Sequence, residues 1–149
     1  MNKNQTYKKI YVDTNVLINY CNSIKDDYDT LEYIFSKRDK KLLFTSSLAI
    51  TQTITRLQTS TSKRKAYSSK DVVEMIEELL KKFSIISLTK EDIEKSMNKQ
   101  CKDLEDNIHY TLSRKLKCDC ILTNNKKDFS QFNIPVFEPI LRLAKLKIK

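Results

Sequence analysis

Residues 8–20, KKIYVDTNVLINY, contain the features that decide the fold. Residues 10–12 are β-branched or aromatic, which predicts a short buried strand. Asp13 follows directly, and apolar residues then recur at helical spacing from a start near Thr14 or Asn15. Asp13 has two interpretations: it caps this helix by accepting from free backbone N–H groups, or it begins an active site. The stretch alone leaves both open.

The alternation of strand and helix continues along the whole chain. Further strands are predicted at residues 41–47, 84–88, 118–123 and 133–137, and helices at 28–40, 48–58, 71–83, 89–97, 103–117 and 138–147, the last with Pro139 in its first turn. Apolar stripes are expected on two helices, formed by Val72, Ile76, Leu79, Leu80 and Phe83 and by Leu104, Ile108, Leu112 and Leu116. This order predicts a single α/β domain over residues 1–149, with a parallel sheet of about five strands flanked by helices.

Composition narrows the function. The chain has 28 Lys and Arg against 19 Asp and Glu, a net charge of +9, which suits a polyanionic partner, although solubility explains part of such a surplus. It has no glycine, which excludes Walker and dinucleotide-binding loops. Four scattered cysteines do not match a zinc or redox spacing. With no apolar run long enough for a membrane span or signal peptide, we expect a cytoplasmic protein without a membrane partner.

Acidic and amide residues gather near the predicted strand ends, where ligands bind in open parallel sheets. Each acid also has a structural explanation, since a carboxylate at a helix start caps it and is favoured by the helix dipole. Converging carboxylates repel one another unless a cation lies between them, and hard oxygen ligands select Mg²⁺ or Mn²⁺. Such ions activate water for attack on a phosphodiester. The residues are Asp13, Asp103, Glu105, Asp106, Asn124, Asn125 and Asp128.

Four blocks of the sequence resemble successive motifs of bacterial PIN-domain proteins. They are YVDTNVLINY (11–20), TSSLAITQ (45–52), DLEDNIHYTLSRKLKCDCILTNNKKDF (103–129) and IPVFEP (134–139), and the long third block is the most specific. The resemblance implies a parallel sheet flanked by helices and a metal-dependent ribonuclease. Many bacterial members are VapC-type toxins, so it also implies RNA as substrate and an antitoxin protein as partner. A second copy of the chain, forming a homodimer, is a further candidate partner.

The same resemblance assigns roles to residues. Asp13, Asp106 and Asp128 would be catalytic ligands of Mg²⁺ or Mn²⁺. Asn125 and Glu105 would lie close to the metal, while Thr14 and Asn15 would orient the site.

One position departs from the family pattern. Typical PIN nucleases carry a glutamate where this chain has Gln52, and a neutral amide supplies no charge to a metal ion. Glu105 could compensate for the missing acid. The departure keeps a second hypothesis open, that the chain is a catalytically weak or inactive PIN-fold module that binds RNA or another protein.

Two further features have competing interpretations. Lys63, Arg64 and Lys65 surround Tyr67 in a polar stretch, which suits RNA binding through phosphates and base stacking, or simply a solvated loop. His109 lies one turn after Asp106 and could reach a phosphate, but we expect a partly exposed helix residue.

Overall fold

Five short parallel strands form one sheet in the order β3-β2-β1-β4-β5. They are β1 (Ile10–Val12), β2 (Leu43–Ser46), β3 (Ser84–Ile86), β4 (Cys120–Leu122) and β5 (Val136–Phe137). The structure is a computed structural model that describes residues 5–97 and 102–149. β1 lies in the centre, where Tyr11 is aligned with Phe44 of β2 and Ile121 of β4. The predicted α/β class and parallel sheet of about five strands are confirmed.

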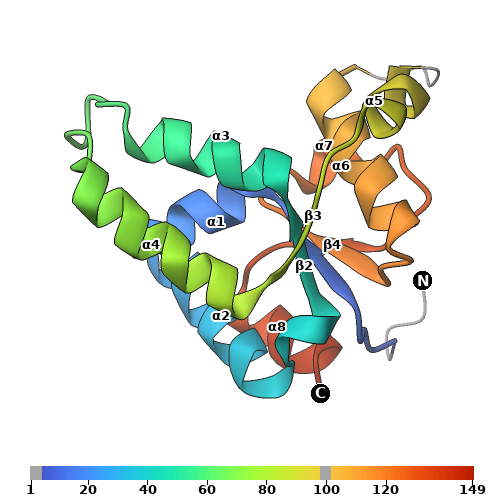
Figure 1. The fold of residues 1–149 in the computed structure, drawn as a ribbon. Helices are drawn as coiled ribbons and strands as arrows, with labels where there is room; N and C mark the ends of the chain where they lie inside the picture. The colour runs from blue at the N-terminus through green and yellow to red at the C-terminus, as the bar shows by residue number, and fades with distance from the viewer. Residues whose placement is uncertain (1–4, 98–101) are drawn as a thin grey trace.

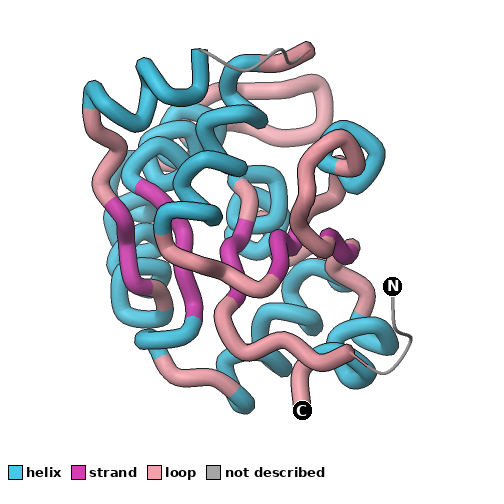
Figure 2. The backbone as a smooth tube through the Cα atoms, turned by 90° about the vertical axis from the view of Figure 1, so that its right-hand side faces the viewer, coloured by secondary structure: helices cyan, strands magenta, loops and turns pink. Residues whose placement is uncertain are grey.

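Helices connect the strands and cover both faces of the sheet (Figure 1). They are α1 (Thr14–Cys21), α2 (Lys25–Lys37), the 3₁₀ turn η1 (Lys40–Leu42), α3 (Ser47–Leu57), α4 (Ser69–Lys82), α5 (Lys90–Met97), α6 (Leu104–Lys115), α7 (Lys126–Phe129) and α8 (Leu141–Lys147). Within residues 5–97 and 102–149, none of these helices is long and apolar enough to cross a membrane. Figure 2 shows the strands in the middle of the molecule with helices around them.

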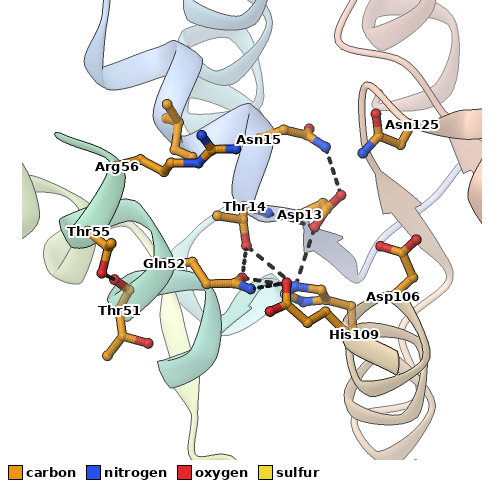
Figure 3. A pocket seen from close by; sticks show the side chains of 12 residues that line it. Asp13, Thr14, Asn15, Thr51, Gln52, Thr55, Arg56, Asp106, His109 and Asn125 are labelled. Carbon is orange, nitrogen blue, oxygen red and sulfur yellow. Dashed lines mark hydrogen bonds and ion pairs between the residues drawn. The ribbon is translucent and has the colours of Figure 1, made fainter. Parts of the chain in front are cut away.

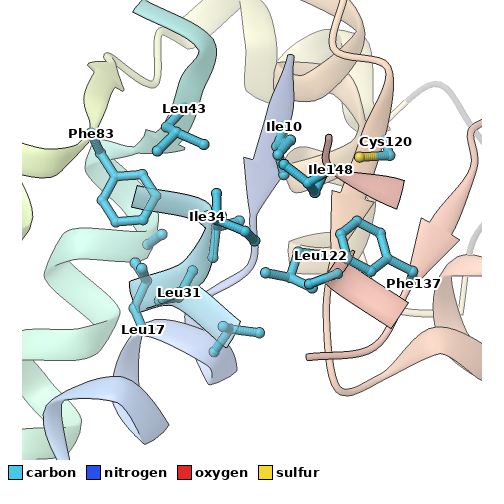
Figure 4. Close-up of a cluster of buried hydrophobic side chains, with 14 of the residues drawn as sticks. Ile10, Leu17, Leu31, Ile34, Leu43, Phe83, Cys120, Leu122, Phe137 and Ile148 are labelled. Carbon is cyan, nitrogen blue, oxygen red and sulfur yellow. The ribbon is translucent and has the colours of Figure 1, made fainter. Parts of the chain in front are cut away.

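Successive side chains of the strands point to opposite faces, so the sheet separates two apolar layers. Ile10 and Val12 pack into the layer that α1, α2 and α8 cover (Figure 4). Tyr11, between them, packs into the other layer, against side chains of α6 and α7. Burial on both faces explains why the strands are almost continuously apolar in sequence.

Several predicted helix starts are confirmed by their caps. The hydroxyl of Ser46 accepts from the backbone N–H of Ala49 and caps α3. Thr89 and Asp92 form a reciprocal capping box at the start of α5, each accepting from the backbone N–H of the other at 3.2 and 3.0 Å.

Three details of the sequence analysis are wrong. Pro139 precedes α8 instead of lying in its first turn, because the helix begins at Leu141 after the N-cap Ile140. Leu80 and Leu104, both expected on buried stripes, are 42% and 44% exposed; Leu80 lies in the last turn of α4 and Leu104 is the first residue of α6.

Candidate active site

A cleft of about 440 Å³ opens beyond the carboxyl end of β1, between α1, α3 and α6 (Figure 3). Every lining residue except Ile18 has a polar side chain. The lining residues are Asp13, Thr14, Asn15, Ile18, Thr51, Gln52, Thr55, Arg56, Glu105, Asp106, His109 and Asn125.

Asp13 lies at the base of the cleft and is only 4% exposed. Its carboxylate accepts hydrogen bonds from the backbone N–H of Thr14 at 2.8 Å, from Asn15 Nδ2 at 2.9 Å and from Thr123 Oγ1 at 2.7 Å. It therefore caps α1 and also faces the cleft, so the two interpretations drawn from the sequence are compatible. Thr123 was missed in the sequence, although it follows β4 as Asp13 follows β1.

Asp106 faces the same cleft from the first turn of α6, which Asp103 caps by accepting from the Asp106 backbone N–H at 3.0 Å. In the part of the chain that the structure describes, no hydrogen bond reaches the Asp106 carboxylate. Burial raises the pKa of Asp106 to about 7, together with the negative charges of Asp103, Asp13, Asp128 and Glu105. Asp106 is therefore an uncompensated acid that a cation would stabilise.

Gln52 bridges α3 to the other two walls of the cleft. Its Oε1 accepts from Thr14 Oγ1 at 2.6 Å, and its Nε2 donates to Glu105 Oε2 at 2.7 Å. Gln52 and Glu105 were both predicted near the site from the sequence, but the hydrogen bond between them was not.

His109 is not the partly exposed residue that we expected. It is 2% exposed, because α6 docks this side against the sheet, where Nδ1 lies 2.7 Å from the hydroxyl of Tyr11. Nε2 lies 3.6 Å from Asp13 Oδ1. Burial lowers the pKa of His109, and the negative charges of Asp13, Glu105 and Asp103 oppose this shift only in part.

The other predicted residues fall into two groups. Asn125 lines the cleft, whereas Asp128 is exposed on α7, outside the lining, and its negative charge helps to raise the pKa of Asp106. Lys63 and Arg64 line a neighbouring cleft of about 530 Å³. The two clefts share three wall residues, Asn15, Ile18 and Arg56. Arg56 was not singled out in the sequence, although it lies one helical turn after Gln52.

The donor set suits a hard divalent cation bound mainly by water. Within residues 5–97 and 102–149, no group of three or more His, Cys, Asp or Glu side chains is placed to hold a metal ion. Mg²⁺, however, is usually bound through one or two carboxylates and keeps several waters. Asp13 and Asp106, with the Asn125 amide, meet that requirement, and the raised pKa of Asp106 marks the position where positive charge is missing.

Comparison with known proteins gives a family match. Residues 9–127 match the family model described as PIN domain. The chain is also 32% identical over 131 residues to the protein named Ribonuclease VapC1 of Aquifex aeolicus (strain VF5), a match that covers 83% of this chain and 85% of that protein.

Solved structures show the same fold at lower identity. A toxin-antitoxin complex from Klebsiella pneumoniae aligns with a TM-score of 0.63 and 20% identity, over 88% of this chain and 98% of that one. VapBC2 from Rickettsia felis, bound to a DNA fragment from its promoter, aligns with a TM-score of 0.60 and 15% identity, over 87% and 98% of the two chains. Likeness at these identities concerns the fold alone.

Proposed function

Because this chain belongs to the PIN-domain family, we propose that it is an endoribonuclease that hydrolyses RNA phosphodiester bonds. The reaction would need Mg²⁺ or Mn²⁺, and the chain would be the toxin of a toxin–antitoxin pair. The relative named Ribonuclease VapC1 supports the activity. The observation that carries the proposal is the pairing of Asp13 and Asp106 at one polar cleft, with the pKa of Asp106 raised by neighbouring acids.

The residues of the cleft have different roles in the proposed reaction. Asp13 and Asp106, with Asn125, would hold the cation, which when bound polarises the phosphodiester and lowers the pKa of an attacking water. The bonds from Thr14, Asn15 and Thr123 fix Asp13 before substrate arrives. Asp106 has no such bonds in the described residues and can adjust to the cation. Asp128 and Glu105 would add negative charge around it without lying at its centre.

The neighbouring cleft gives the RNA a place to lie. Arg56 lines both clefts, and its guanidinium has no hydrogen bond or ion pair in the described residues, so it is available to a phosphate. Arg64 is different, because it donates to the backbone carbonyls of Arg56, Leu57 and Lys65 and stacks on Tyr67 at 4.6 Å. We assign Arg64 to holding the loop, and the exposed Lys63 and Lys65 to contacting phosphates.

An antitoxin protein and a second copy of the chain are the proposed protein partners. Exposed apolar side chains on and beside α2 and α4 offer surface to such partners. They include Ile24, Tyr28, Val73 and Leu80. We place the protein in the cytoplasm, where its RNA substrate lies. The free thiols of Cys21, Cys118 and Cys120 fit a reducing compartment.

Cleavage of a fluorescently labelled RNA tests the activity. We expect the wild type with Mn²⁺ to cut, excess EDTA to stop it, and Asp106→Asn to lose cutting while still binding RNA. A second candidate function, RNA binding without cleavage, is favoured by the neutral Gln52 at a position where the family usually has an acid. Binding of RNA without cutting under all metal conditions would establish that alternative, and absence of both would leave a protein-interaction module.

A further inference from the structure

The direction of one hydrogen-bond chain can be read from its end at Glu105. A carboxylate accepts hydrogen bonds and donates none, so the group of Gln52 that lies 2.7 Å from Glu105 must be the amide nitrogen. The carbonyl oxygen of Gln52 is thereby turned inward, toward Thr14 and His109. The exposed acid therefore fixes the orientation of the amide.

The same reasoning fixes a proton on His109 Nε2. Three oxygens lie around it: Gln52 Oε1 at 3.3 Å, Thr14 Oγ1 at 3.4 Å and Asp13 Oδ1 at 3.6 Å. Thr14 gives its only hydroxyl proton to Gln52 at 2.6 Å. All three oxygens therefore present lone pairs to Nε2. An unprotonated Nε2 would add its own lone pair and repel them, so Nε2 carries a proton.

The other ring nitrogen has a partner that can donate. Nδ1 lies 2.7 Å from the Tyr11 hydroxyl, which in turn lies 2.9 Å from Ser46 Oγ. Ser46 Oγ accepts from Ala49 N, and because a hydroxyl both donates and accepts, Ser46 can donate to Tyr11 when the Tyr11 proton turns from Ser46 to Nδ1. A chain from Ser46 through Tyr11 to Nδ1 thus leaves every member satisfied.

We infer that His109 is a positioning residue whose Nε2–H, oriented by Tyr11 on one side and by the Glu105–Gln52 pair on the other, holds Gln52 and the Asp13 carboxylate in place. The Nε2–H is shared among three oxygens at long distances. It therefore orients Gln52 and Asp13 without forming a strong hydrogen bond. Removing this N–H leaves Gln52 Oε1 and Asp13 Oδ1 with donors from Thr14 alone among the described residues, and lets Asp13 shift relative to Asp106. The effect on cleavage rests on the proposed function, whereas the position of the proton does not.

Nuclear magnetic resonance tests the proton directly. The chain contains one histidine, so ¹⁵N-labelled protein gives a single imidazole pattern that needs no assignment. Long-range ¹⁵N–¹H correlations should show Nε2 protonated and Nδ1 bare. A neutral ring protonated on Nδ1 would overturn the inference, whatever the activity of the protein.

Two substitutions test the role. His109→Gln keeps a donor and an acceptor in the same order, because its amide nitrogen can replace Nε2–H and its carbonyl can accept from Tyr11. His109→Leu keeps the bulk and removes both. We expect kcat to fall roughly 10–100-fold in the leucine variant, as for other residues that orient a ligand, with KM unchanged and with most activity restored by glutamine.

Leu112→Ala is the matched control, since it weakens the packing of α6 without touching the chain of hydrogen bonds. An equal loss of kcat in Leu112→Ala and His109→Leu at equal loss of stability would reduce His109 to a packing residue and overturn its positioning role. If the wild type itself cut no RNA, the proposed function would fail, and the imidazole pattern would still decide the inference.

Discussion

Asp106 faces the cleft beside Asp13, and the charge of Asp13 is one of the causes that raise the pKa of Asp106 to about 7, after burial and the charge of Asp103. An unfolded aspartate titrates near pKa 3.9. An acid whose folded pKa is raised stabilises the fold fully below the unfolded value, and that contribution is lost as pH rises to the folded value. We expect Asp106 to destabilise the metal-free protein progressively between about pH 4 and pH 7.

Asp106→Asn isolates this effect, because the amide does not titrate. In EDTA, the melting temperature of the variant should exceed that of the wild type by a margin that grows from pH 5 to pH 7.5 and is constant above. The same proton must leave before a cation binds, so the affinity for Mn²⁺ should rise over the same interval. A difference in melting temperature that does not change with pH would show that Asp106 titrates as an ordinary aspartate.

Gln52→Glu tests whether position 52 reaches the metal. If it does, the added charge should tighten Mn²⁺ binding and raise the rate of cleavage. The structure adds a cost, since the new carboxylate would replace the amide that donates to Glu105 at 2.7 Å. We expect the metal-free variant to lose about 0.5–1.5 kcal/mol of stability, the net contribution of one ordinary hydrogen bond, because this bond is exposed and water can solvate the freed groups. Unchanged metal affinity by calorimetry would place position 52 away from the cation.

The exchanged pair Gln52→Glu with Glu105→Gln is the control. It keeps the net charge, and the hydrogen bond can form again with the amide on the opposite side. We expect it to recover the stability lost by Gln52→Glu alone. Failure to recover would mean that the bond between these two side chains does not account for the loss.

Asp13→Asn separates a helix cap from a metal ligand. Asparagine caps a helix equally well. Here, however, three donors converge on the two oxygens of Asp13, so the NH2 group of asparagine would face a donor where an oxygen now accepts. A change in stability alone is therefore not decisive. The decisive quantity is the stabilisation by Mn²⁺, about 2.7 kcal/mol at a hundred times Kd. We expect the variant to lose most of this stabilisation and all cleavage while RNA binding survives. The exposed Asp26→Asn serves as control, and equal metal-induced shifts in Asp13→Asn and the wild type would leave Asp13 as a cap only.

Replacement of the basic loop tests RNA binding. Changing Lys63, Arg64 and Lys65 to alanine should weaken binding similarly for all RNA sequences and flatten its salt dependence, because phosphate contacts are lost. The pair Lys63→Ala with Lys65→Ala should give most of this effect without loss of stability. Arg64→Ala alone should instead lower the melting temperature, since it frees three backbone carbonyls. An unaltered salt slope in the triple variant would assign the loop to solvent.

The sequence predicted the sheet well because its strands are buried on both faces and its helices carry clear apolar stripes. It placed Asp13 and Asn125 at the cleft because residues after parallel strands meet at one edge of the sheet. It could not show that Asp128 lies outside the lining, since that depends on the direction in which the four-residue helix α7 leaves β4.

The sequence pattern could not predict the burial of His109, for a different reason. The middle of α6 is buried on all sides, and polar residues there, such as Asn107 and Thr111, bond to Ser96 of α5. A helix that uses polar side chains for contact with another helix looks half-exposed by periodicity. Only the packing of α6 against the sheet, at Tyr11, and against α5, at Ser96, distinguishes the two cases.

The last prediction concerns the ends of two helices in a chain without glycine. After α6, the N–H groups of Lys117 and Cys118 bond to the carbonyls of Arg114 and Ser113 at 3.0 and 2.9 Å, the pattern of a Schellman motif. Its central residue adopts a left-handed conformation, and Lys117 does so with φ of 55°. Ser23 occupies the same position after α1, with φ of 56°.

Left-handed backbone costs an L-residue roughly 1–2 kcal/mol, whereas glycine adopts it without that penalty but loses more entropy on folding. We therefore expect Ser23→Gly and Lys117→Gly each to stabilise the protein by about 0.5–1 kcal/mol, or a few degrees in melting temperature. Ser23→Gly is the cleaner test, because Lys117→Gly also removes a cation that favours the carboxyl end of α6. The two gains should add, since the sites share no contacts.

Glu77→Gly, in the exposed interior of α4, is the opposite control and should lose a comparable amount of stability. Destabilisation by glycine at Ser23 as large as at Glu77 would show that the left-handed residues carry no strain.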